Sequence, residues 1–149
     1  MKTKFVHINI VAWDWRKLAD FYRKVFGCVP KPPERNLSGD WLDKLTSLKD
    51  ARITGIHLDL PGFGANGPTL EIFAYNEIDE SADVQINSPG FAHIAFAVDD
   101  VEEALALVVE NGGSAVGEAV NTEVRGLGRI DVVYVRDPEG NIIELQKVE

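Results

Sequence analysis

Two histidines and two glutamates of this sequence occupy positions from which they could bind a metal ion. His7 and His93 each stand third in a short apolar run, and Glu71 and Glu144 each lie inside another apolar run. A lone glutamate in such a strand more often faces solvent, and a lone histidine more often belongs to the core. An unpaired buried carboxylate costs several kcal/mol, however, so four such residues at related positions favour a joint explanation. If they converge, two imidazoles and two carboxylates would bind a divalent ion whose charge the carboxylates balance.

These positions are related by an internal repeat. His93 follows His7 by 86 residues (93 − 7), and the same interval leads from Asp14 to Asp100. The apolar run around each histidine and the helix start that follows it therefore keep one register. A shared register of this length seldom arises by chance, and such repeats indicate two copies of one structural module.

The last strand of each copy gives a second interval. Glu144 follows Glu71 by 73 residues (144 − 71), which is 13 fewer than the interval between the two histidines (86 − 73). The first copy therefore contains 13 additional residues. The stretch 31–50, with its prolines and a short helix-like piece, is long enough to supply them. Both copies thus place a histidine in the first strand and a glutamate in the last.

Apolar periodicity and helix caps predict the order β-α-β-β-β in each copy. Asp14 and Asp100 are expected to cap the two helices, which Gly27 and the run Asn111–Gly113 end. Strands are predicted at 4–12, 28–32, 52–60 and 68–75, and again at 91–97, 114–120, 130–136 and 141–148. We therefore expect an α+β fold. Residues 1–149 would form a single domain of two repeated modules, about 1–78 and 88–149, joined by a linker near 76–89.

The bulk composition excludes several classes of function. The 149 residues carry a formal net charge of −9 and a pI near 4.8, opposite to the basic surface of nucleic-acid-binding proteins. No apolar run approaches the ~20 residues of a membrane-spanning helix. The first residues do not read as a secretion signal, and Cys28 is the only cysteine, so no disulfide within the chain can form. We therefore expect a cytoplasmic protein whose partner is a small-molecule substrate, with neither nucleic acid nor membrane.

Four short motifs carry a resemblance to a known family. They are Val6–Ile8, Leu70–Ile72, Ala92–Phe96 and, above all, Tyr134–Leu145. Together they resemble the vicinal oxygen chelate superfamily, which includes glyoxalase I, methylmalonyl-CoA epimerase, ring-cleaving dioxygenases and the fosfomycin and bleomycin resistance proteins. Within the last motif, Pro138 suits the first corner of a tight turn and Gly140 its left-handed position. This segment is similar to the closing hairpin of the family.

The resemblance implies two paired βαβββ modules that curl into a half-open, barrel-like sheet around a metal site. Matched motif by motif, it implies that the metal ligands are His7, Glu71, His93 and Glu144. The expected cofactor is one divalent metal ion, and mixed imidazole and carboxylate ligands suit Co, Ni, Zn, Mn or Fe(II) better than Mg. Relatives pair their modules either within one chain or between two chains, and we expect a homodimer in both arrangements.

The chemistry that the resemblance implies follows from two open positions on a six-coordinate ion. A substrate with vicinal oxygens, or an enolisable thioester, fills these positions, and the ion acts as a Lewis acid that lowers the cost of an enolate. A proton removed next to the carbonyl then returns to the same or a neighbouring carbon, which gives epimerisation or isomerisation. The base in relatives is thought to be a ligand carboxylate that loosens from the metal. Glu144 is the first candidate for this role here and Glu71 the second.

A set of four ligands fits some members of the family poorly. Ring-cleaving dioxygenases use only two histidines and one carboxylate, and fosfomycin resistance enzymes resemble a three-ligand version. Bleomycin resistance proteins bind the drug without a metal, so a complete ligand set argues against them as well. Glutamate at position 71 matches glyoxalases, whereas methylmalonyl-CoA epimerases usually have glutamine there. The apolar side chains of the insert at 31–50 would form a lid or pocket wall, which suits a cyclic or acyl substrate.

We therefore favour a metal-dependent isomerase or epimerase that abstracts a proton α to a carbonyl through a metal-stabilised enolate. Two alternatives stay open: a glyoxalase I-like lyase that acts on a hemithioacetal, and a catalytically silent small-molecule binding protein of the resistance type. The third histidine, His57, has no histidine counterpart, because the interval of 73 residues leads to Ile130. It is predicted to lie on a strand surface or in a pocket wall rather than to bind the metal.

Overall fold

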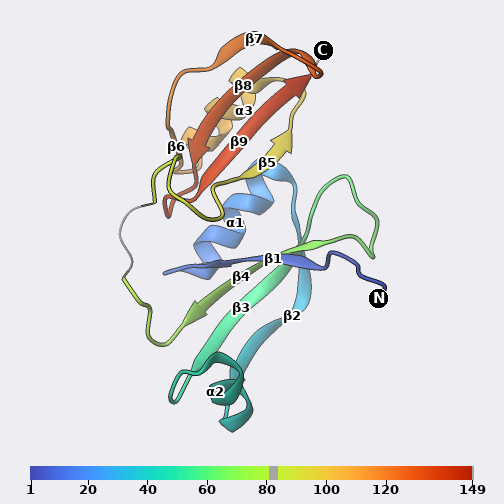
Figure 1. The fold of residues 1–149 in the computed structure, drawn as a ribbon. Coiled ribbons are helices and arrows are strands. Elements are labelled where there is room, and N and C mark those ends of the chain that lie inside the picture. The colour runs from blue at the N-terminus through green and yellow to red at the C-terminus, as the bar shows by residue number, and fades with distance from the viewer. Residues whose placement is uncertain (81–83, 149) are drawn as a thin grey trace. The chain divides into compact units, whose positions relative to one another are not determined.

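The structure is a computed structural model that describes residues 1–80 and 84–148. The chain forms two compact units, Met1–Glu80 and Ser81–Glu149 (Figure 1). Residues 81–83 of the predicted linker lie outside the described residues, as does residue 149.

Unit 1 is a four-stranded sheet with two helices. Its elements in chain order are β1 (His7–Val11), α1 (Trp15–Phe26), β2 (Val29–Ser38), α2 (Asp40–Thr46), β3 (Arg52–Asp59) and β4 (Thr69–Tyr75). The strand order across the sheet is β1-β4-β3-β2. The first and last strands of the unit, β1 and β4, are parallel neighbours, whereas β3 pairs antiparallel with both β4 and β2.

Helix α1 covers one face of this sheet. It begins at Trp15 because the Asp14 carboxylate accepts a hydrogen bond from the Lys17 backbone N–H. It ends at Gly27, which has a φ of 67°, a left-handed conformation that glycine adopts without steric cost. The sheet face beneath α1 consists of buried aliphatic side chains, namely Ile56, Leu58, Leu70 and Ile72.

Helix α2 packs on the opposite face of the same sheet. Its buried residue Leu42 forms an apolar cluster with Ile53 of β3 and Phe73 of β4. Successive side chains of a strand point to opposite faces, so Phe73 lies on the same face as Glu71, two residues earlier. The region of 31–50 therefore contributes an apolar cluster to the sheet face that bears Glu71.

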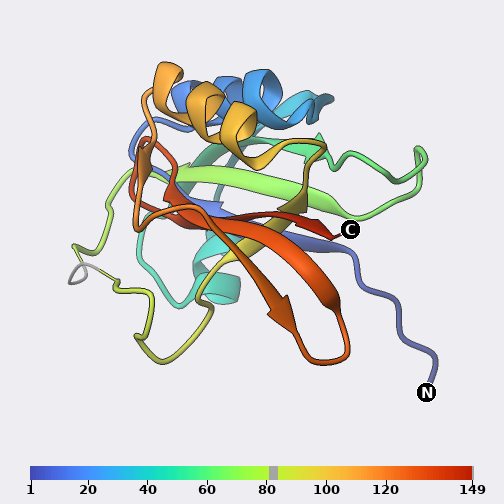
Figure 2. The same ribbon diagram turned by 90° about the horizontal axis from the view of Figure 1, so that it is seen from above.

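Unit 2 repeats this arrangement. Its elements are β5 (Ile94–Ala97), α3 (Val101–Glu110), β6 (Ser114–Ala115), β7 (Val120–Val124), β8 (Gly128–Arg136) and β9 (Ile142–Val148). The strand order is β5-β9-β8-β6, with β7 also paired to β8, and the first and last strands are again parallel neighbours. Helix α3 starts where the Asp100 carboxylate accepts from the Glu103 N–H, and it lies over one face of the strands of its unit (Figure 2). That face is formed by Val133, Val135, Ile143 and Leu145.

The predicted α+β class and the repeated order of strand, helix and further strands are confirmed, with two differences. Strand β2 continues to Ser38 through Pro32 and Pro33, whereas the predicted strand ends at residue 32. It lies at the edge of the sheet, where a proline that cannot donate a hydrogen bond is tolerated, and its register shifts between Lys31 and Arg35. The expected strand 114–120 is instead divided into β6 and β7, which pair with different parts of β8.

The closing turn of unit 2 forms as its sequence predicts. Asp137 is buried, and its carboxylate accepts hydrogen bonds from the backbone N–H groups of Glu139 and Asn141. Gly140 has a φ of 90°, which a residue with a side chain rarely adopts. The carboxylate of Asp137 thus satisfies the donors of the turn that leads into β9, the strand that carries Glu144.

Cys28 is buried directly after helix α1. Burial raises the pKa of its thiol to about 11, from an ordinary value of 9.0. The thiolate is the reactive form, so we expect alkylation by iodoacetamide at pH 8 to be about 100-fold slower in the folded protein than in guanidinium. The rate should rise about tenfold per pH unit below the pKa. Mass spectrometry of timed samples measures both rates, and rapid labelling of the folded chain would contradict this placement.

None of the helices in the described part of the chain has the length and apolar content that crossing a bilayer requires.

Candidate functional site

The first predicted pair, His7 and Glu71, comes together in unit 1. In the parallel register of β1 and β4, His7 lies opposite Thr69 and Asn9 lies opposite Glu71, so the two side chains are diagonal neighbours on one face. The His7 Nε2 atom is 3.5 Å from Glu71 Oε2. The Glu71 side chain is only 12% exposed, whereas that of His7 is 42% exposed. The carboxylate is therefore withdrawn into the sheet, and the imidazole lies at its open edge.

Two further side chains of unit 1 hold the Glu71 carboxylate. His57, its direct register partner on β3, places Nε2 2.7 Å from Oε1. Asn9 donates from Nδ2 to Oε2 at 3.1 Å. Each carboxylate oxygen thus has its own nitrogen partner besides His7, and the burial of Glu71 is compensated by these contacts.

The protonation state of His57 follows from its two partners. An ionised carboxylate only accepts hydrogen bonds, so Nε2 carries the proton that is donated to Glu71. The other ring nitrogen, Nδ1, is 3.1 Å from the Thr69 hydroxyl, from which a neutral ring accepts. Burial lowers the pKa of His57 and outweighs the Glu71 carboxylate, which raises it, so the ring is neutral at pH 7. Nε2 therefore serves as a donor to Glu71 and presents no lone pair to a metal.

The second predicted pair, His93 and Glu144, comes together in unit 2. His93 directly precedes β5, and its Nε2 atom is 3.2 Å from Glu144 Oε2 on the neighbouring strand β9. The Glu144 side chain is 16% exposed. Tyr134 is the register partner of Glu144 on β8, and the centroid of its ring lies 5.2 Å from that of the His93 ring. Burial raises the pKa of Tyr134, and the Glu144 carboxylate raises it further.

The strand registers correct the predicted counterpart of His57. His57 lies opposite Glu71, and Tyr134 lies opposite Glu144, so Tyr134 and not Ile130 occupies the equivalent position. The cause is the loop before the last strand, which spans nine residues in unit 1 (60–68) and five in unit 2 (137–141). Four of the 13 additional residues of the first copy thus lie in this loop rather than in 31–50. The strand pairing reveals that His57 and Tyr134 are equivalent, which the sequence intervals alone do not show.

The two His–Glu pairs have the spacing that adjacent ligands of one ion require. Nitrogen and oxygen donors bind transition metals at about 2.0–2.2 Å, so adjacent ligands of one ion lie about 3 Å apart. The measured separations of 3.5 and 3.2 Å are close to this value. Across residues 1–80 and 84–148, no group of three or more histidine, cysteine, aspartate or glutamate side chains is arranged to hold an ion. Each unit supplies two donors, and the meeting of all four at one ion stays a prediction.

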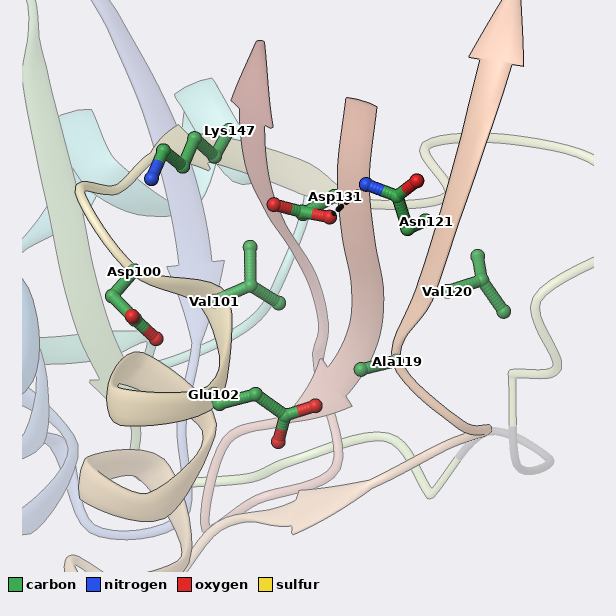
Figure 3. A pocket seen from close by; sticks show the side chains of 8 residues that line it. All are labelled: Asp100, Val101, Glu102, Ala119, Val120, Asn121, Asp131 and Lys147. Carbon is green, nitrogen blue, oxygen red and sulfur yellow. Dashed lines mark hydrogen bonds between the residues drawn. The ribbon is translucent and has the colours of Figure 1, made fainter. Parts of the chain in front are cut away.

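A separate pocket of about 280 Å³ lies in unit 2 (Figure 3). Its lining includes Asp100 at the start of α3, Asp131 of β8 and Lys147 of β9. Lys147 is three positions beyond Glu144 and is the register partner of Asp131, so both point to the sheet face opposite to Glu144. The pocket is therefore not part of the His93–Glu144 site.

Comparisons with known proteins agree with this architecture. Residues 4–145 match the profile of the Glyoxalase/Bleomycin resistance protein/Dioxygenase superfamily. A glyoxalase family protein from Bacillus cereus has a similar structure, with a TM-score of 0.77 at 20% identity over 99% of this chain and 94% of that one. A glyoxalase I variant from Zea mays gives a TM-score of 0.65 at 23% identity, over 96% of this chain and 44% of that one. No protein of curated function matches the sequence. At these identities the structural likeness establishes the fold.

Proposed function

The chain belongs to the Glyoxalase/Bleomycin resistance protein/Dioxygenase superfamily, and on this premise we propose that it is a metal-dependent isomerase or epimerase. Its substrate would be a carbonyl compound with vicinal oxygens or a thioester, from which a proton α to the carbonyl is removed and to which it is returned. The observation that carries this proposal is the pair of matched His–Glu contacts, one in each repeat.

The metal would be held by His7, Glu71, His93 and Glu144. Their donor atoms fit a divalent transition metal, since imidazole and carboxylate are its usual ligands and the separation within each pair suits adjacent positions. When bound, the ion supplies Lewis-acid polarisation of a substrate oxygen, which offsets the negative charge of an enolate. The proposal does not depend on whether the four ligands come from one chain or from two chains of a homodimer.

The proton transfer is assigned to Glu144. This carboxylate is largely buried beside His93, and its register partner across the sheet is Tyr134. Glu144 takes the α-proton and returns it to the same carbon for epimerisation or to a neighbouring carbon for isomerisation. General acid–base catalysis of this kind contributes about 10²–10⁴-fold to the rate.

A second candidate function is a glyoxalase I-like lyase acting on a hemithioacetal. The observation that favours it is the identity of residue 71, which is glutamate, as in the glyoxalases that the sequence resembles. The same base and the same ligands would serve this reaction, in which the proton moves between two adjacent oxygen-bearing carbons. A binding protein without catalytic activity is the third possibility that the experiment must separate.

The proposed setting is the cytoplasm, with a small-molecule substrate and no nucleic-acid or membrane partner. The negative net charge and the single, buried cysteine support this assignment.

One experiment distinguishes the three functions. The protein is purified without chelators, its metals are counted by elemental analysis, and it is incubated in D₂O with a 2-methyl-branched acyl thioester, an α-hydroxyketone or the hemithioacetal of methylglyoxal and glutathione. The proposed function predicts about one divalent ion per chain and deuterium at the α-carbon of the thioester or the hydroxyketone. Turnover of the hemithioacetal alone identifies the lyase. Absence of both metal and exchange identifies a binding protein.

A further inference from the structure

His57 is placed to fix the orientation of Glu71. Its ring is held at both nitrogens, by Glu71 Oε1 at 2.7 Å and by the Thr69 hydroxyl at 3.1 Å. The ring centroids of His7 and Phe73 also lie 5.9 and 6.0 Å from that of His57, in T-shaped arrangements. These contacts restrain the ring, and they direct its Nε2–H at Glu71.

The equivalent position in unit 2 holds its glutamate differently. In unit 2, Tyr134 faces Glu144 as its register partner and interacts with the carboxylate through its hydroxyl, and His93 Nε2 lies 3.2 Å from the same carboxylate. Glu71, in contrast, accepts a hydrogen bond from His57 at Oε1 and one from Asn9 at Oε2, and its Oε2 also lies near His7. A hydroxyl rotates about its C–O bond, whereas the imidazole N–H is fixed by the ring, so the two carboxylates are not equally restrained.

We propose that His57 is a positioning residue that locks Glu71 as a stationary metal ligand, while its counterpart Tyr134 leaves Glu144 free to move during proton transfer. With Oε1 committed to His57, Oε2 is the oxygen that faces His7, the other donor of this pair. This inference rests on the proposed function, and it gives the two glutamates, which are equivalent in the repeat, different tasks. Hydrogen-bond partners of ligands commonly set ligand orientation in metal sites.

The test measures Co²⁺ affinity of the whole protein by competition with a chelator, in the absence of substrate. His57→Phe keeps a ring of similar shape but removes the donor, and it should raise the Kd for Co²⁺ by about 10- to 100-fold. His57→Gln places an amide N–H near the position of Nε2 and should stay within about threefold of the parent. Thr69→Val, which removes the hydroxyl behind the ring, should raise the Kd by about two- to tenfold, whereas Thr69→Ser should restore it. Thermal unfolding of each metal-free variant shows that it is folded.

Glu71→Ala separates failure of this inference from failure of the proposed function. If Glu71→Ala leaves the Co²⁺ affinity unchanged, Glu71 is not a ligand and the proposed metal site is wrong. If Glu71→Ala weakens binding but His57→Phe does not, the site stands and His57 has no positioning role. If His57→Phe and His57→Gln weaken binding equally, the donated hydrogen bond is not the cause and the inference is overturned. Weak binding by His57→Phe with recovery in His57→Gln supports it.

Discussion

Glu144→Gln is expected to slow exchange of the substrate α-proton with solvent by about 10²–10⁴-fold, the usual contribution of a general base. Glutamine has almost the same shape and keeps an oxygen for the metal, but it cannot accept the proton. Deuterium incorporation in D₂O, measured by NMR on whichever substrate the wild type turns over, gives the rate directly. Glu123→Gln, an exposed glutamate of β7, is the matched control and should exchange at the wild-type rate.

Comparison with Glu71→Gln tests the division of labour between the two glutamates. Glu144→Gln and Glu71→Gln each remove one negative charge. If the loss of charge were the only effect, α-proton exchange would be slowed equally in both variants. Because His57 and Asn9 hold Glu71 in place, its substitution should weaken Co²⁺ binding while reducing exchange less than Glu144→Gln does, once the metal is saturating. Wild-type exchange in Glu144→Gln together with loss of exchange in Glu71→Gln would reverse the assignment of the base.

His93→Ala is expected to raise the Kd for Co²⁺ by more than about 100-fold, beyond the range for residues that only support ligands. The truncation removes one nitrogen donor from a set of four and leaves Glu144 without its imidazole partner at 3.2 Å. Metal analysis after dialysis against a defined concentration of Co²⁺ measures the loss. His7→Ala should have an effect of similar size, since His7 is the repeat counterpart.

The third histidine provides the control for this prediction. His57→Gln also removes an imidazole, but the ring nitrogen of His57 donates to Glu71 and is not proposed to bind the ion. The Kd of this variant for Co²⁺ should therefore stay within about threefold of the wild-type value. The sequence contains only these three histidines, so the comparison covers every imidazole of the chain. Equal metal content in His93→Ala and the wild type would remove His93 from the ligand set.

Much of the fold could be predicted because local signals and the repeat agree. The caps at Asp14 and Asp100 and the turn at Asp137–Asn141 depend on nearby backbone groups, so short motifs determine them. The extent of β2 could not be predicted in this way. Its prolines argue against a strand unless the strand is known to lie at the sheet edge, and edge position is a property of the assembled sheet.

In the candidate site, too, the His–Glu pairs could be predicted from the repeat, whereas the role of His57 could not. The repeat intervals identified the two histidines and two glutamates, and each His–Glu contact depends only on the pairing of the first and last strands of one unit. The role of His57 was missed because it depends on the β3–β4 register, which the longer loop at 60–68 shifts relative to the second copy. A search for the residue opposite each glutamate, rather than at a constant interval, would have found both His57 and Tyr134.

Anomalous diffraction at the cobalt edge, from crystals grown with excess Co²⁺, tests most directly whether the two repeats share one ion. We expect a single strong peak with His7 Nε2, Glu71 Oε2, His93 Nε2 and Glu144 each within about 2.3 Å of it, from one chain or from two. Peaks at only one of the two His–Glu pairs, or no peak near either pair, would show that the halves do not form a common metal site.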